Sequence, residues 1–365
     1  MSLSAAPGGA TPFHGWHDVR LIAFTDAGQA QACALAHKLG LPEGAAMRCG
    51  QPRGLGDWTA AGFAEHADAL VFVGATGIAV RAVAPHLVSK ACDPAVVVVD
   101  EGARFAIPLV SGHLGGANEL AVHIAGLLGA TPVVTTATDG RGVFAVDSWA
   151  RAQGCAVENP ERIKDVSGKL LAGATVVVRS AWPVDGPVPA GVRLLVGDEQ
   201  PAVAADVHVN LGRAANAASL HVVPRIVVAG IGCRRGLSCA VIKRAVEQAL
   251  YEAGIADVAL RAVASIDIKR DEVGLEEFCA GRGLPFKVFS AEELCAVEGT
   301  FASSAFVRSV AGVDNVCERA AVRASGGTLL LPKSAHDGVT VALAVAPFAP
   351  SWSWSCGYAY QQVKE

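Results

Sequence analysis

The chain has 365 residues, enough for two or three domains, and a formal net charge of −4. Hydrophobic residues make up 52% and charged residues only 18%, a balance typical of buried parallel sheets joined by tight turns. The acidic balance argues against a nucleic-acid partner, because phosphate binding needs a basic face. No apolar run approaches the roughly 20 residues that a membrane helix requires, so we expect no membrane partner.

Ten cysteines are scattered along the chain without a C-x-x-C pair. The first residues show neither the basic nor the apolar segment of a secretory signal. We therefore expect a cytoplasmic protein with reduced thiols. The histidines are dispersed, and His113 and His123 lack partners at ligand spacing, so we predict no metal site.

The first 139 residues alternate between short apolar runs and amphipathic segments. We expect strands at 19–24, 69–73, 96–99, 104–109 and 132–135, and helices at 28–39 and 117–128. Val96–Val99 consists entirely of valine, which is typical of a strand buried on both faces. The alternation predicts an open α/β sheet with right-handed crossovers, which we place at residues 18–139. Residues 1–17 are expected to be disordered.

A change in composition near Asp139 indicates a smaller middle domain, which we place at residues 140–224. Pro224 then precedes a third domain at residues 225–347, again with alternating strand and helix patterns. The predicted fold is therefore α/β with three units, in which open, mostly parallel N-terminal and C-terminal sheets are joined by a smaller α/β domain. Residues 348–365 mix serines with aromatic residues, and we expect them to form a surface tail.

The segment Ser111–Glu119, SGHLGGANE, stands between a predicted strand and a predicted helix. Its glycines remove side chains that would keep a ligand from the backbone, and the helix N-terminus directs unpaired N–H groups into the loop. The loop therefore suits a carboxylate, a phosphate or an oxyanion, and His113 and Glu119 could transfer protons. The alternative is a tight turn with an exposed histidine and a helix-capping side chain. The expected binding residues are Gly112, Gly115, Gly116 and Asn118.

Two further groups follow predicted buried strands. Asp100 and Glu101 come directly after the valine run, and paired carboxylates can hold a proton at neutral pH by mutual repulsion. Arg81 and Lys90 fall beyond another strand, where ligands bind in open α/β sheets. The alternatives are a polar turn for the carboxylates and surface charges for the two cations.

Gly230–Gly236, GIGCRRG, follows a predicted strand at 225–229 and is expected to be a loop. Its glycine spacing differs from the dinucleotide fingerprint, which needs the third glycine one residue earlier, so a nucleotide-dependent oxidoreductase is disfavoured. Arg234 and Arg235 beside a helix start could grip an acidic ligand in bidentate fashion. A solvated basic turn is the alternative.

Several motifs run in one register along the chain and together resemble the cobalt-precorrin-5A hydrolases, the CbiG family of anaerobic cobalamin biosynthesis. The resemblance covers about residues 70–345 and is weakest in the middle domain. The N-terminal motifs are Gly74–Arg81, Ala84–Leu87, Asp93–Glu101, Pro108–Leu120, Thr135–Asp139 and Phe144–Asp147. The C-terminal motifs are Gly230–Gly236, Ala264–Lys269, Glu272–Leu275, Gly312–Ala321, Lys333 and Val339–Ala342.

The resemblance implies a reaction in which the δ-lactone joining the ring A acetate to C20 of a cobalt corrinoid is opened and C20 leaves as acetaldehyde. It implies no cofactor, because cobalt arrives inside the corrinoid substrate. The candidate bases are His113, Glu119, Asp100 and Glu101. The N–H groups of Gly115–Ala117 would hold the oxyanion. The cations expected to clamp the substrate carboxylates are Arg81, Lys90, Arg234 and Arg235.

Two questions about function and partners stay open at this point. The chain could instead be a non-catalytic protein that binds a corrinoid and hands it over within the same pathway. Neighbouring cobalamin-pathway enzymes and a second copy of the chain, as a homodimer, are the protein partners to consider.

Overall fold

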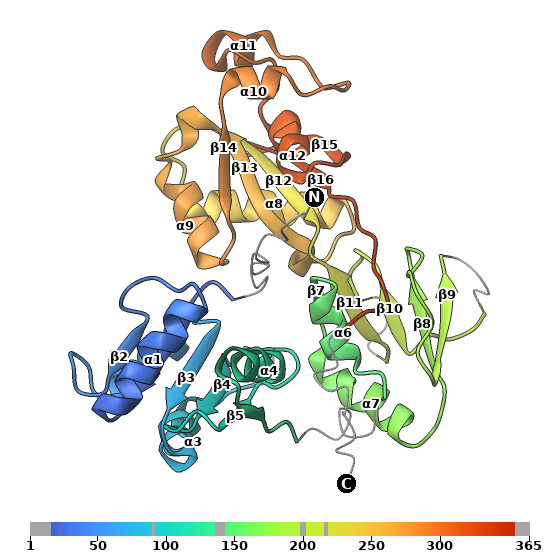
Figure 1. Cartoon of the computed structure of the whole chain (residues 1–365). Coiled ribbons are helices and arrows are strands. Elements are labelled where there is room, and N and C mark those ends of the chain that lie inside the picture. Colours follow the sequence, from blue (N-terminus) through green and yellow to red (C-terminus); the bar gives the residue numbers. More distant parts are fainter. Residues whose placement is uncertain (1–15, 90–91, 136–142, 198–201, 215–217, 355–365) are drawn as a thin grey trace, which may run out of the picture. The chain divides into compact units, whose positions relative to one another are not determined.

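The computed structural model describes residues 16–89, 92–135, 143–197, 202–214 and 218–354 (Figure 1). One compact unit ends at Gly142, and the other spans Val143–Trp354. The described residues form three separate sheets, one in the first unit and two in the second. The predicted boundary after residue 224 therefore lies between two sheets of one compact unit. Within the described residues, every helix is too short or too polar to span a bilayer.

The first unit is a six-stranded sheet with helices on both faces. The strand order is β2 (Ala46–Arg48), β1 (Val19–Ala23), β3 (Ala69–Val73), β4 (Ala95–Val99), β5 (Phe105–Val110) and β6 (Thr131–Pro132). All neighbours are parallel except β4 and β5, because a tight turn after β4 reverses the chain. One face packs against α1 (Asp26–Lys38) and α4 (Ala117–Leu128), and the other against α2 (Leu55–Ala64) and α3 (Thr76–Val83).

The alternation of side chains along the central strands explains this layering. Leu70 and Phe72 point to the α2–α3 side, and Val71 and Val73 point to the α1–α4 side. The valine strand β4 is fully buried, as its composition predicts. At the N-terminal end the expectation of disorder is wrong for Trp16 and His17. Trp16 is buried, and the His17 N–H donates to the Asp68 carboxylate. Residues 1–15 lie outside the described part.

The second sheet has the order β7 (Cys155–Val157), β11 (Leu220–Pro224), β10 (Val207–Val209), β8 (Val176–Ser180) and β9 (Val192–Val196). Only the β7–β11 pair is antiparallel. The helices α6 (Val146–Ala152) and α7 (Ile163–Leu171) accompany this sheet (Figure 1).

The segment 348–354 differs from the expected surface tail. Trp352 is 4% exposed and stacks on Trp149 with ring centroids 5.3 Å apart. The Trp149 Nε1–H donates to the Ser351 carbonyl at 2.8 Å. Burial of these large rings attaches the segment to the middle sheet, and the sequence pattern did not reveal this partner.

The third sheet has the order β14 (Phe286–Phe289), β13 (Leu260–Ile266), β12 (Val227–Cys233), β16 (Val339–Val345) and β15 (Thr328–His336). The strands β12, β13 and β14 are parallel, whereas β16 and β15 form an antiparallel hairpin beside β12. One face packs against α8 (Cys239–Glu252) and α9 (Val273–Gly281). The other packs against α10 (Ala291–Cys295), α11 (Ala305–Ala311) and α12 (Cys317–Ser325).

Gly230 and Gly232 lie inside β12, so the prediction of a loop over residues 230–233 is wrong. A Cβ on Gly230 would lie 1.8 Å from the Cys317 carbonyl oxygen and 2.7 Å from the Ala321 nitrogen. The glycine therefore lets α12 pack directly against β12. The connection to α8 consists of residues 234–238, and Ser238 is the N-cap of that helix.

Candidate functional site

A cavity of about 800 Å³ opens where β12 and β13 end and the β15–β16 hairpin turns. Parallel strands bring the segments that follow them to one sheet edge, which is where open α/β sheets bind ligands. The hairpin adds a wall from β15, and α11 with the start of α12 adds another. The residues that line it include Gly232, Cys233, Arg234, Arg235, Ile266, Ile268, Lys269, Val307, Val310, Asn315, Val316, Cys317, Lys333, His336 and Thr340.

Four cations gather around this cavity, together with an aliphatic wall. Arg234 and Arg235 are exposed in the turn after β12, and neither guanidinium forms an ion pair within the described residues. The Arg234 N–H donates to the Gly338 carbonyl at 3.1 Å, which ties this turn to the hairpin. Lys269 and Lys333 complete the set. Cations beside aliphatic side chains suit a large ligand that carries carboxylates on an apolar frame.

Glu272 connects two of these cationic elements. Its carboxylate lies 2.9 Å from the Lys269 Nζ and accepts the Gly236 N–H. Burial alone would raise the pKa of Glu272, but the Lys269 ammonium, the Gly236 N–H and the Arg235 charge together lower it below its ordinary value. Glu272 therefore stays ionised at neutral pH and holds Lys269 beside the arginine turn.

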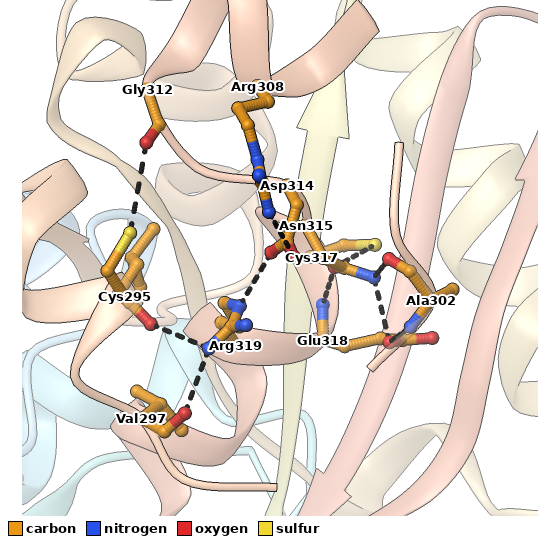
Figure 2. A network of polar contacts seen from close by, with 11 residues as sticks. Cys295, Val297, Ala302, Arg308, Gly312, Asp314, Asn315, Cys317, Glu318 and Arg319 are labelled. Atoms are coloured by element: carbon orange, nitrogen blue, oxygen red, sulfur yellow. Dashed lines mark hydrogen bonds and ion pairs between the residues drawn. The ribbon is translucent and has the colours of Figure 1, made fainter. Parts of the chain in front are cut away.

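A second polar network includes residues of α11, α12 and the segment between them (Figure 2). The Arg319 guanidinium contacts Asp314 at 3.0 Å and donates to the Val297 carbonyl at 2.9 Å. Arg308 reaches the other Asp314 oxygen at 3.2 Å. Burial would raise the pKa of Asp314, but these two arginines lower it below its ordinary value. The network joins the end of α11 to α12, and so fixes one wall of the cavity.

Cys317 reaches the cavity but is not a suitable nucleophile. It is 2% exposed, and burial raises the pKa of its thiol to about 11. The thiol is therefore neutral at physiological pH, whereas nucleophilic cysteines are thiolates. Among the described residues, no three His, Cys, Asp or Glu side chains gather as metal ligands would.

The Ser111–Glu119 loop folds onto itself. The N–H groups of Gly116, Ala117 and Asn118 donate to the carbonyls of His113, Ser111 and Gly112 at 2.9, 3.1 and 2.9 Å, respectively. The predicted oxyanion hole is therefore wrong for Gly116 and Ala117, because their N–H groups already have partners.

The glycines of this loop serve its own packing. A Cβ on Gly112 would lie 2.8 Å from Asn118 Oδ1, and one on Gly115 would lie 2.4 Å from the Ser111 Cβ. Gly116 has φ +80°, a left-handed conformation that favours glycine. These contacts explain the glycines without a ligand, in contrast to the expectation that they expose the backbone.

His113 and Glu119 keep their predicted positions. His113 is half-buried in the loop, and Glu119 is half-buried in the first turn of α4. Asn118 beside them is buried. Proton transfer by His113 and Glu119 stays a prediction.

Asp100 and Glu101 do not form a pair that shares a proton. Asp100 accepts the N–H groups of Arg104 and Phe105 at 2.7 and 2.6 Å. Burial would raise the pKa of Asp100, but these donors and the Arg104 guanidinium lower it below its ordinary value. Glu101 instead accepts the Thr25 hydroxyl at 2.7 Å. These contacts are those of a polar turn, and a catalytic role for Asp100 or Glu101 stays a prediction.

The remaining predicted cations have different outcomes. Arg81 is exposed on α3 and donates to the Gly77 carbonyl of its own helix at 3.2 Å. Lys90 lies outside the described residues. Of the three predicted clamps that the structure describes, Arg234 and Arg235 line the large cavity and Arg81 does not.

Comparison with known proteins finds two family models that match separate regions of the chain. The model for "Cobalamin synthesis G N-terminal" matches residues 58–139, and that for "Cobalamin synthesis G C-terminus" matches residues 227–344. The cobalt-precorrin-5A hydrolase of Salmonella typhimurium is 37% identical over 289 residues, which are 76% of this chain and 82% of that protein. The chain belongs to the cobalt-precorrin-5A hydrolase family.

Other members and a solved structure extend the comparison. The cobalt-precorrin-5A hydrolase of Priestia megaterium is 33% identical over 296 residues, 76% of this chain and 79% of that protein. A crystal structure described as a cobalamin biosynthesis protein G homologue from Sulfolobus solfataricus has 21% identity and a TM-score of 0.40, covering 91% of this chain and 98% of that one.

The family's two matched regions each contain one of the sites described above. The loop at 111–119 falls in the N-terminal match, and every residue that lines the cavity falls in the C-terminal match. Sequence reasoning did not assign Lys269 and Lys333 to a site. The available signal for Lys269 was its place just beyond the apolar segment that forms β13. Lys333 lies within β15 and offered no such signal.

Proposed function

We propose that this protein is a cobalt-precorrin-5A hydrolase, which opens the δ-lactone of cobalt-precorrin-5A, releases acetaldehyde and yields cobalt-precorrin-5B in cobalamin biosynthesis. The observation that carries this proposal is the cationic cavity of about 800 Å³ inside the C-terminal region that matches the family. Its volume falls in the range of sites for large organic ligands.

The substrate is a macrocycle with carboxylates around an apolar ring, and the cavity presents the complementary groups. Arg234, Arg235, Lys269 and Lys333 supply positive charge for the carboxylates. Aliphatic side chains such as Ile268 and Val310, both largely exposed, offer contact area for the ring. Cobalt enters as part of the substrate, so the proposal requires no protein-bound metal.

The chemistry requires water, a base and a stabilised oxyanion. The water oxygen bonds to the lactone carbonyl carbon while the base takes a water proton. The acyl C–O bond then breaks, so the ring A acetate becomes a free carboxylate and C20 keeps the lactone oxygen. As that oxygen becomes the carbonyl oxygen of acetaldehyde, the bond between C20 and the macrocycle breaks and its electron pair stays on the macrocycle. We propose His113 or Glu119 as the base. Because the N–H groups of Gly116 and Ala117 donate within their own loop, we do not propose them as donors to the oxyanion.

Acetaldehyde assay separates this function from that of a binding or handover protein. Purified full-length chain is mixed with cobalt-precorrin-5A, and acetaldehyde and corrinoid product are quantified against a reaction without protein. We expect one acetaldehyde per corrinoid, with many turnovers per protein. Tight binding without acetaldehyde would instead identify a corrinoid carrier.

The proposal also includes the setting of the reaction. We place the enzyme in the cytoplasm, and the nine described cysteines, all free thiols, support a reducing compartment. Neighbouring enzymes of the pathway and a second copy of the chain are the protein partners that we propose to test, by size-exclusion chromatography of the purified chain.

A further inference from the structure

The strand β15 is irregular at the point where it borders the cavity. Leu331 pairs with Leu343 and Ser334 pairs with Val341, so β15 has one residue more than β16 over this stretch. Pro332 lies in the irregularity and has no N–H to give to a partner strand. Such bulges often redirect a side chain beside a functional site.

The extra residue leaves the Lys333 N–H in need of another partner. That N–H donates to Glu318 Oε1 at 2.7 Å, across from the first turn of α12. Lys333 is also one of the cations that line the cavity. The position of this cation therefore depends on a carboxylate that comes from a different element.

Glu318 is 1% exposed and receives three N–H donors. Its Oε2 accepts the Ala302 N–H at 2.8 Å and the Asn315 Nδ2–H at 2.7 Å, as Figure 2 shows. Both oxygens thus act as acceptors. A glutamine at this position would have to turn its NH₂ group toward an N–H donor, so an isosteric amide cannot replace the carboxylate.

The close packing of α12 on β12 explains how a carboxylate comes to lie there. Gly230 lets the start of α12 approach the strand, and Glu318 is the second residue of that helix. The Arg308–Asp314–Arg319 contacts form a separate branch that does not include Lys333 (Figure 2). Of the two neighbouring sets of contacts, the one around Glu318 includes the cavity cation Lys333, and the one around Asp314 does not.

We propose that Glu318 is a positioning residue that holds the bulged Lys333 at the cavity, so that its ammonium group meets a substrate carboxylate. This inference rests on the proposed function. Glu318 itself does not contact the substrate. Its contribution to binding passes through Lys333.

A double-mutant cycle tests this coupling. The dissociation constant of cobalt-precorrin-5A is measured for the wild type, Glu318→Gln, Lys333→Ala and the double variant. We expect Glu318→Gln to weaken binding about tenfold when Lys333 is present and less than about twofold when it is absent. The matched control Arg323→Ala, which removes an exposed cation of the same helix outside the cavity lining, should bind as the wild type does.

Equal losses in both backgrounds would overturn the proposal, because a merely structural role weakens binding regardless of Lys333. If Glu318→Gln does not fold, Asn315→Ala removes one donor to the carboxylate and takes its place in the cycle. A coupled loss of about threefold is then expected, and an additive loss overturns the proposal. If the wild type hydrolyses the substrate but the losses in the double-mutant cycle are additive, only the positioning role of Glu318 is contradicted. A wild type that neither binds nor hydrolyses removes the proposed function as well.

Discussion

The Ser111–Glu119 loop and the Gly230–Gly236 segment look alike in sequence, since both place glycines between a strand and a helix beside charged residues. The structure separates them. The first donates its N–H groups to its own carbonyls, whereas the second presents Arg234 and Arg235 to a large cavity. Glycine spacing alone therefore did not distinguish a closed turn from a ligand site.

The glycines of the two regions make room for different neighbours. Gly112 and Gly115 make room for the side chain of Asn118 and for Ser111 of the same loop, and Gly230 makes room for the backbone of α12. None of the three is explained by close approach of a ligand. The cations that are left without an internal partner distinguish the two regions better than the glycines do.

The largest expected effect tests whether the N-terminal loop has a chemical role at all. If His113 and Glu119 transfer protons, His113→Ala and Glu119→Gln should lower kcat about 10²–10⁴-fold with little change in KM. Steady-state acetaldehyde release measures both constants. The exposed His37 on α1 provides a control, since His37→Ala should leave kcat unchanged. Wild-type kcat in both loop variants would make this region a turn and nothing more.

The second prediction concerns the glycine of β12. Gly230→Ala should destabilise the C-terminal sheet by about 3 kcal/mol, near the upper end of overpacking costs, because the new Cβ meets backbone that cannot yield without moving α12. The thermal unfolding temperature and the rate of acetaldehyde release should both fall. Gly281→Ala is the matched control, since its Cβ would enter open space at the end of α9 and should leave both measurements unchanged. A stable, active Gly230→Ala chain would contradict the packing described here.

The third prediction concerns substrate affinity at the cavity. Replacing Arg234 and Arg235 together by alanine should raise KM about 10–100-fold and change kcat much less, because each guanidinium contributes a charge-assisted hydrogen bond to binding. Arg261→Ala, an exposed arginine near the start of β13 and outside the cavity lining, should have no effect. An unchanged KM in the double variant would reduce this segment to a solvated turn, like its N-terminal counterpart.

The smallest effect concerns Asp100, which the structure assigns to a turn. The pKa of Asp100 is lowered in the fold, so its contribution to stability is present at higher pH and is lost as the pH falls through the folded-state value, below about pH 4. Asp100→Asn should lower the free energy of unfolding by about 1 kcal/mol at pH 7 and should make that free energy less dependent on pH in the acid range. Thermal unfolding at several pH values measures both. Glu43→Gln, at an exposed loop position, should reproduce the wild-type profile.

Local patterns predicted much of the fold. The strand 69–73 and the helix 117–128 have the predicted bounds, because their apolar spacing is complete within each segment. The strand β2 was missed because it is three residues long and only half-buried. The helix α2 was missed because it begins without a capping side chain and contains two glycines, Gly56 and Gly62, which favour a loop.

Sequence by itself determined the family and the α/β class, since both depend on motifs and periodicities that lie within short segments. Only the tertiary structure decided which charged residues share a site. Arg234, Lys269 and Lys333 come from three segments far apart in the chain, and the strand order of the third sheet brings them to one cavity. The Glu318 carboxylate and the Lys333 N–H are likewise paired by packing, because a buried polar group takes the partner that the tertiary structure brings to it.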